Sequence, residues 1–258
     1  MNATTTIRGF IGAILAGALC GCSAQGALAP RPDASGQIAF TGFPPNVRVG
    51  NLALIRADGS DLRLLPVHAF SPAFSPDGRL MAAVGDTGLS LLVMNADGSK
   101  SRTILRWRLM REPAWSPDGT QLAFVCSDSI AGYSTNICVA NTDDSGWRQL
   151  TIAADAEPRW SWSANEIVAV SGYKLLTIIT PDGETVRTLP TPAFSGVTGP
   201  TWSADGHALA FVGEKWKLEG DAVMHLDFDS IYLINADGSG LTRLTNGLDA
   251  AEPAWSSP

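Results

Sequence analysis

The chain has 258 residues, of which 45% are hydrophobic and 17% are charged, and its formal net charge is −7 at pH 7. This composition excludes a disordered chain, and the length suits one large all-β domain. The negative charge repels phosphate backbones, which argues against nucleic acid as a partner.

Residues 1–22 have the pattern of an export signal. Arg8 precedes an apolar run, 9–19, which is shorter than the roughly 20 residues that a transmembrane helix needs. The run ends at Leu19-Cys20-Gly21-Cys22, which resembles a bacterial lipobox with Cys22 as the lipidated residue. An ordinary signal, cleaved for instance after Ala24, and an uncleaved anchor remain open alternatives. In each case we expect the protein to leave the cytoplasm.

The resemblance to a lipobox implies a covalent lipid anchor at Cys22. Ser23 follows the cysteine, which resembles the pattern of lipoproteins sent to the outer membrane of Gram-negative bacteria. The implied location is the periplasm, anchored to a membrane and most simply the outer one. Residues 23–36 are small and rich in proline, so we expect them to form a tether.

From Gln37 to Pro258 two sequence patterns each recur five times. The first is a short apolar strand, at 38–40, 80–84, 122–125, 167–170 and 209–212. The second is a strand, a turn that contains Asp, and another strand, at 52–65, 91–105, 137–150, 176–189 and 231–244. The strands are apolar at nearly every position, as expected where both faces of a sheet are covered by neighbours.

A third recurring unit is typified by Pro113-Ala114-Trp115-Ser116-Pro117-Asp118-Gly119. Its aromatic position is held by Phe74, Trp115, Trp160, Trp202 and Trp255. The recurrence at roughly 40 to 50 residues is typical of a four-stranded β-propeller blade. We therefore expect these aromatic side chains to pack between blades. In the Ser-Pro-Asp-Gly turns, proline fixes φ and glycine accepts the positive φ at the exit.

The two ends of the chain complete each other. The repeat begins at Gln37 with the second strand of a blade, and the chain ends at 253–258 with a first strand that has no second strand after it. The sequence predicts an all-β, five-bladed β-propeller of four-stranded antiparallel blades. We expect the ring to be closed by pairing of the C-terminal strand with the N-terminal blade, so that no edge stays free.

The combination of Pro-Ala-Trp-Ser-Pro-Asp-Gly, Leu-Ala-Phe-Val and Val-Met-Asn-Ala-Asp-Gly-Ser resembles the propeller repeat of the TolB family. The resemblance covers residues 37–258 and implies an exported propeller that binds a partner. Two departures limit what it implies: TolB has an α/β domain before its propeller, and its propeller has six blades. The role of TolB in the Tol-Pal system is therefore not carried over. Some serine peptidases have a similar repeat, but Gly-x-Ser-x-Gly does not occur in this sequence.

The strand order separates short Asp-Gly turns on one face of the ring from longer, variable loops on the other. Variable loops on a rigid scaffold usually carry binding sites. Glu112, Glu157 and Glu252 each precede the proline of a first strand, so symmetry directs three carboxylates toward the channel mouth. They are our candidates for binding a cation or a basic group. The alternative is that they are solvated residues restricted by the following proline.

Three further aromatic residues on the long-loop face are candidate contacts, namely Trp107, Tyr133 and Trp216. The alternative for each is simple packing under a loop. Trp216 belongs to a polar insertion, 213–230, whose Asp and His residues lack the spacing of a calcium loop, so we predict no metal site. We also expect Cys126 and Cys138 to be two free, buried thiols, because the assumed strand register places them too far apart for a bridge.

These observations favour a non-enzymatic, monomeric propeller, without a cofactor, that binds an envelope protein or a peptidoglycan-associated partner. A glycan hydrolase that uses Glu112, Glu157 and Glu252 is one alternative. However, hydrolases need unlike carboxylates in unlike environments, whereas these three repeat in one environment. A purely structural module of an envelope complex is another alternative.

Overall fold

The computed structural model describes residues 37–42, 50–56, 59–85, 87–129, 135–152, 155–191, 193–219, 222–225, 229–246 and 253. All of them belong to one compact unit, 35–258. Every regular element in these ranges is a β-strand. None of the described segments forms a helix of the length and hydrophobicity that crossing a membrane requires.

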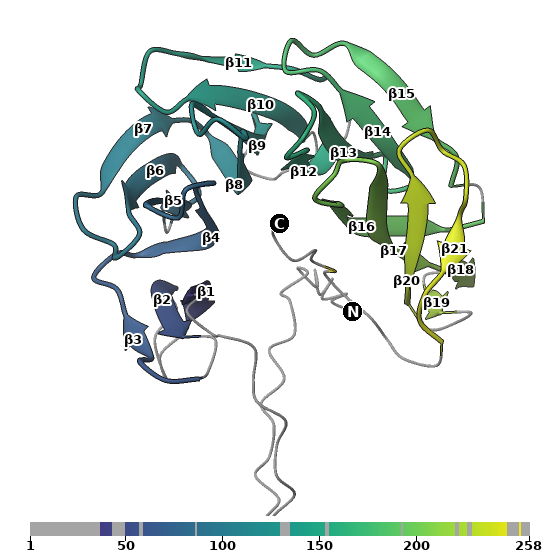
Figure 1. The fold of residues 1–258 in the computed structure, drawn as a ribbon, viewed down its shortest axis with the longest axis horizontal. Helices are drawn as coiled ribbons and strands as arrows, with labels where there is room; N and C mark the ends of the chain where they lie inside the picture. Colours follow the sequence, from purple (N-terminus) through teal and green to yellow (C-terminus); the bar gives the residue numbers. More distant parts are fainter. Residues whose placement is uncertain are drawn as a thin grey trace, which may run out of the picture. The chain divides into compact units, whose positions relative to one another are not determined.

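The strands form five blades that are arranged in a ring, so the fold is a five-bladed β-propeller, as predicted (Figure 1). Blade 1 contains β1 (Gln37–Gly42), β2 (Asn51–Arg56) and β3 (Arg63–Leu64). Blade 2 contains β4 (Ala69–Phe74), β5 (Leu80–Gly85), β6 (Ser90–Asn95) and β7 (Arg102–Arg106). Blade 3 contains β8 (Leu109–Trp115), β9 (Gln121–Ser127), β10 (Asn136–Asn141) and β11 (Trp147–Gln149). Blade 4 contains β12 (Asp155–Trp160), β13 (Ile167–Ser171), β14 (Leu175–Ile179) and β15 (Thr185–Leu189). Blade 5 contains β16 (Gly196–Trp202), β17 (Ala208–Glu214), β20 (Ser230–Asn235) and β21 (Thr242–Arg243).

Each blade is an antiparallel meander, and β4, β8, β12 and β16 are the innermost strands (Figure 1). Connections such as β8–β9 and β10–β11 lie at one end of the blades, which we call the turn face. Connections such as β9–β10 and β11–β12 lie at the opposite end, which we call the loop face. The predicted C-terminal strand that closes blade 1 lies outside the described residues, apart from Pro253, and remains a prediction.

The core lies between successive blades because the strands are apolar on both faces. Trp115 packs with Phe124 and Met110 in the cluster between blades 2 and 3. Trp160 and Trp202 occupy the same place in the clusters of the next two interfaces. All three indoles are at most 6% exposed, which confirms the predicted packing of these tryptophans between blades. Trp255 lies outside the described residues. Phe74 packs against the cluster between blades 1 and 2.

The Ser-Pro-Asp-Gly turns form as expected. In the first of them the N–H of Gly78 donates to the Ser75 carbonyl, 2.9 Å away, and Gly78 has φ of 67°. The Ser75 hydroxyl donates to Asp77 Oδ1 at 2.7 Å, and the same oxygen accepts the N–H of Arg79 at 3.0 Å. The side chains thus satisfy the turn's polar groups and fix the hairpin that follows.

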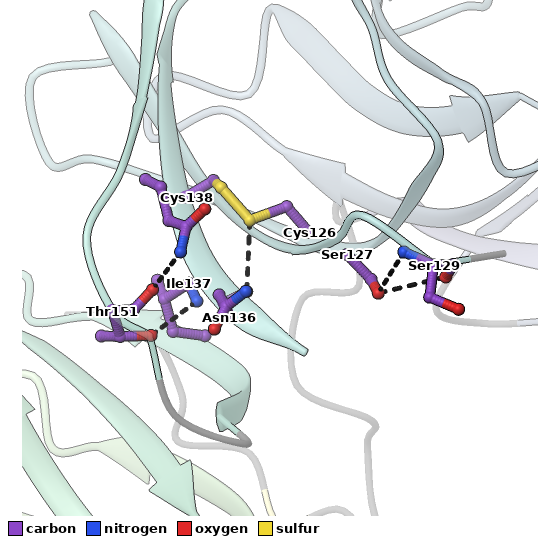
Figure 2. Close-up of a disulfide and its surroundings, with 8 residues drawn as sticks. Cys126, Ser127, Ser129, Asn136, Ile137, Cys138 and Thr151 are labelled. Atoms are coloured by element: carbon purple, nitrogen blue, oxygen red, sulfur yellow. Dashed lines mark hydrogen bonds between the residues drawn. A yellow bond between two sulfur atoms is a disulfide. The ribbon is translucent and has the colours of Figure 1, made fainter. Parts of the chain in front are cut away.

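Cys126 and Cys138 form a disulfide, so the prediction of two free thiols is wrong (Figure 2). The predicted distance assumed that Val84 pairs with Leu89 in blade 2, whereas Val84 pairs with Leu91. In the matching register of blade 3, Cys126 lies opposite Asn136 and Cys138 lies two residues further along β10. The twist of the strands brings this diagonal pair to a Cα–Cα distance of 5.9 Å, within the range of a disulfide.

The insertion of blade 5 is a two-stranded ribbon on the loop face. Its strands are β18 (Trp216–Glu219) and β19 (Ala222–His225), which pair antiparallel between β17 and β20 (Figure 1). The ribbon adds no blade to the ring, which agrees with the predicted number of blades.

Candidate functional site

The inner strand of each of blades 2 to 5 contains a bulge at the residue before its proline. Ser71, Glu112, Glu157 and Gly199 have φ between 53° and 59°, which is the left-handed region. The pairing with the second strand of the blade shifts register at each of these positions. Proline has no N–H to donate, so a bulge is where an inner strand can accept it. Glu112 and Glu157 therefore lie within their strands rather than at the strand ends.

The two described glutamates connect successive blades. Glu112 Oε2 accepts the main-chain N–H of Glu157 at 3.0 Å, from the bulge of the next inner strand. Glu157 Oε2 in turn accepts the N–H of Gly199. At the start of the series the N–H of Ser71 donates to the Thr41 hydroxyl at 3.2 Å. The carboxylates thus bind amide groups that each bulge removes from its ladder, a structural role that the sequence did not reveal. Glu252 lies outside the described residues.

The three aromatic residues predicted as contacts lie in different surroundings. Trp107 is partly buried, and its ring centroid lies 4.6 Å from that of Trp147 at the boundary of blades 2 and 3. Trp216 is partly exposed at the base of the β18–β19 ribbon. Tyr133 lies outside the described residues. Of these residues, only Trp216 combines an aromatic surface with partial exposure and a place beside the inserted ribbon.

Trp216 belongs to a group of residues around the first two residues of β16. The Ser195 hydroxyl donates to the Trp216 carbonyl at 2.6 Å and accepts the Trp216 N–H at 3.1 Å, so the main chain is anchored on both sides. A Cβ atom at Gly196 would lie 2.7 Å from Glu214 Oε2 and 3.4 Å from Trp216 Nε1. The absence of a side chain at Gly196 therefore leaves room for a carboxylate acceptor and an indole donor side by side.

Tyr173 lies next to this group. Its carbonyl accepts the N–H of Val197 at 2.9 Å, while its side chain is 70% exposed on the loop face. Gly172 and Tyr173 both have positive φ, 56° and 65°, as in a type I′ hairpin turn. Tyrosine is an unusual residue for this backbone conformation. Tyr173 is not among the residues predicted from the sequence, although a Gly-Tyr pair between two apolar runs is a readable signal for such a turn.

Arginines connect the blades near the turn face. Arg148 Nη2 donates to the Pro181 carbonyl of the next blade at 2.8 Å, and Arg187 Nε donates to the Ala236 carbonyl at 2.6 Å. Arg102 makes the equivalent contact with the Thr142 carbonyl. Each arginine follows the turn of its own blade at a fixed short interval, so the repeat itself could have predicted them.

The turn face also contains a groove of about 870 Å³ between blades 4 and 5. Its polar lining is already engaged within the protein: Arg187 pairs with Glu166 at 3.0 Å, and Asp205 accepts the His207 N–H at 3.0 Å. The groove therefore offers few charged groups to a ligand.

Turn aspartates have lowered pKa values. A serine hydroxyl and a main-chain N–H both donate to one carboxylate, which stabilises its ionised form and lowers its pKa. The aspartates in question are Asp77, Asp97, Asp118, Asp143, Asp205 and Asp237. These aspartates cap turns, because the hydrogen bonds that lower their pKa values come from residues of the same turn.

A model of the TolB β-propeller domain matches residues 23–258. The chain belongs to the TolB β-propeller family. Two solved TolB-type structures show the same fold: one provisionally assigned as TolB from Agrobacterium tumefaciens, and TolB from Acinetobacter baumannii. The first is 20% identical with a TM-score of 0.62 and covers 84% of this chain and 85% of that one. The second is 20% identical with a TM-score of 0.65 and covers 84% of this chain and 55% of that one.

A curated relative of this TolB-type propeller is an uncharacterised peptidase, YuxL, of Bacillus subtilis (strain 168). It is 27% identical over 150 residues, which is 51% of this chain and 22% of the relative. The chain therefore matches about a fifth of that protein's length.

Proposed function

We propose that this TolB-type propeller is an exported, non-enzymatic binding protein that holds an envelope protein or an envelope polymer on its loop face. It acts as a monomer, and a lipid on Cys22 tethers it to a membrane, the outer membrane in our proposal. The β18–β19 ribbon and the exposed Tyr173 are parts of the binding face.

The observation that carries the proposal is the equivalence of Glu112 and Glu157. Each accepts a main-chain N–H from the bulge of the next inner strand. A glycan hydrolase of the usual kind needs one acid and one ionised carboxylate in unlike surroundings. Two carboxylates with the same place and the same kind of partner favour a scaffold over a catalytic pair.

The disulfide supports export. Disulfides form and persist in oxidising compartments, and Cys126–Cys138 is buried between two core strands. A location in the periplasm agrees with the signal-like residues 1–22. Binding by the channel carboxylates Glu112, Glu157 and Glu252 remains part of the proposal, in addition to the structural role of the first two.

Site-specific photo-crosslinking tests which face binds. A photoreactive residue replaces Tyr173 on the loop face or, as the matched control, Asp182, whose side chain is 86% exposed at a turn of the same blade. We expect a discrete cross-linked species from envelope extracts with the first variant only. Cross-links from Asp182 alone, or from neither position, would overturn the assignment of the face.

The carboxylates are tested in the same assay. Glu112→Gln with Glu157→Gln keeps an oxygen acceptor for each amide but removes both charges. Loss of capture by a double variant that is still fully folded at the assay temperature would support direct binding by these charges. Unchanged capture would limit both residues to their structural role, and release of cleaved glycan would refute the non-enzymatic proposal.

A further inference from the structure

We infer that the group of residues at the start of β16 is a binding subsite for a neutral saccharide unit, with Tyr173 and Trp216 as its aromatic surfaces and Glu214 as its hydrogen-bond acceptor. This inference rests on the proposed function and names the chemistry of the polymer that the loop face holds. It concerns the boundary of blades 4 and 5, where Glu214 accepts the hydroxyl of Thr198, and the neighbouring Gly199 donates its N–H to Glu157.

The geometry is that of a preformed site. Glu214 lies at the end of β17, its carbonyl accepts the N–H of Ser195 at 2.8 Å, and its Oε1 accepts the Thr198 hydroxyl at 3.4 Å. Both Glu214 Oε2 and Trp216 Nε1 lie within 3.4 Å of the point where a Cβ of residue 196 would stand. An acceptor and a donor are thus fixed beside an aromatic ring, the combination that orients a polyhydroxylated ring.

Tyr173 supplies a second aromatic side chain at the same blade boundary. Its main chain is bonded to Val197, the neighbour of Gly196, so the two aromatic residues flank the start of β16. A tyrosine with φ of 65° and 70% exposure costs free energy without gaining burial. Strain at an exposed residue is expected where the side chain has a function on the surface.

The local charges select among ligand classes. Lys174 follows Tyr173, and Lys215 precedes Trp216, so each of the two aromatic residues has an ammonium group directly beside it in the chain. The net charge of −7 and Glu214 repel a polyanion, whereas the two lysines weaken the local attraction for a cationic peptide. A neutral ring with hydroxyl and amide groups can use the aromatic faces, the donors and the acceptor together.

The test compares three soluble probes on the full-length protein: tetra-N-acetylchitotetraose, tetragalacturonate and a lysine-rich peptide. Binding is followed by tryptophan fluorescence and by saturation-transfer NMR, which reports contact of sugar C–H groups with aromatic rings. We expect the neutral tetrasaccharide to bind, and Tyr173→Asn and Trp216→Leu each to weaken it about tenfold. Both changes leave the main-chain anchors in place, because Ser195 and Val197 bond main-chain atoms of these residues.

Two further variants complete the design. Gly196→Ala should displace the Glu214 carboxylate and weaken binding, whereas Trp162→Ser, which removes a 46% exposed aromatic ring from the turn face, should not. Three results would overturn the inference: no binding of the tetrasaccharide, binding by the Tyr173 and Trp216 variants as tight as by the wild type, or preference for either charged probe. Photo-crosslinking from Tyr173 to an envelope protein would still uphold the proposed function in that case, so the two failures are distinguishable.

Discussion

The blade-to-blade carboxylate contacts give a prediction that can be worked through quantitatively. Glu112→Ala removes the acceptor of the Glu157 N–H, which the bulge keeps out of the strand ladder. A hydrogen bond to a charged group contributes roughly 1.5–3 kcal/mol, so we expect the variant to lose about 2 kcal/mol of unfolding free energy. In a domain of this size that loss lowers Tm by about 4–8 °C.

Glu112→Gln separates charge from geometry. The amide oxygen can still accept the N–H, so we expect a loss of about 1 kcal/mol or less. The assay is urea unfolding followed by circular dichroism at pH 7, with Glu184→Ala as the control because Glu184 is exposed in a turn of blade 4. If Glu112→Ala, Glu112→Gln and the control all unfold within about 0.5 kcal/mol of the wild type, the structural role of the carboxylate is refuted.

Backbone conformation gives an internal check at Glu157. Alanine and glycine at this position both remove the acceptor of the Gly199 N–H. However, Glu157 has φ of 55°, which costs any residue with a Cβ about 1 kcal/mol and costs glycine little. Glu157→Gly should therefore be the more stable of the two variants, and the reverse order would contradict the bulge geometry.

Three other predictions concern the disulfide, the arginine contacts and the turn aspartates. Replacing Cys126 and Cys138 by serine should cost about 3 kcal/mol of unfolding free energy, and thiol alkylation of the wild type under denaturing, non-reducing conditions should label neither residue. Arg187→Met should cost about 2 kcal/mol in urea unfolding because it leaves the Ala236 carbonyl and Glu166 without their donor, whereas Arg148→Lys should cost less. The lowered pKa values of Asp77, Asp118 and Asp205 give stability that is present above the ordinary pKa of 3.8 and is lost as pH falls through the lower pKa of the folded state. When these three are replaced by asparagine, Tm should fall less steeply below pH 4 than it does in the control variant Asp128→Asn. The same dependence of Tm on pH in both variants would contradict the stabilising role of the three aspartates.

The fold was predictable because each blade repeats the same local choices. Apolar strands, an aromatic residue at one position and turns that contain Asp recur in all five repeats, so errors in any single repeat have little effect. The disulfide was not predictable in this way. It depends on strand register, and the connection after Gly85 contains two more residues than the tight turn that the prediction assumed.

The roles of the glutamates were hidden for a different reason. Glu112 and Glu157 share a position in the repeat, and this pattern predicts carboxylates that converge on a common ligand. Only the left-handed bulge shows that each carboxylate has an amide of the next blade within reach. Tyr173 is not predicted because it lies in a short connection between Ser171 and Leu175, whereas the candidate aromatic residues come from longer loops.

Departures from the repeat concentrate in blade 5. Gly199 replaces glutamate at the bulge, Arg243 bonds to Ser230 and Thr245 of its own blade, and the ribbon interrupts the connection from β17 to β20. Positions that serve only the ring would be expected to keep the repeat, since every interface has the same geometry. Blade 5 departs from the repeat at these positions, and it carries Glu214 and Trp216 at its boundary with blade 4. We therefore expect blade 5, where the repeat is broken, to carry a function that the ring itself does not require.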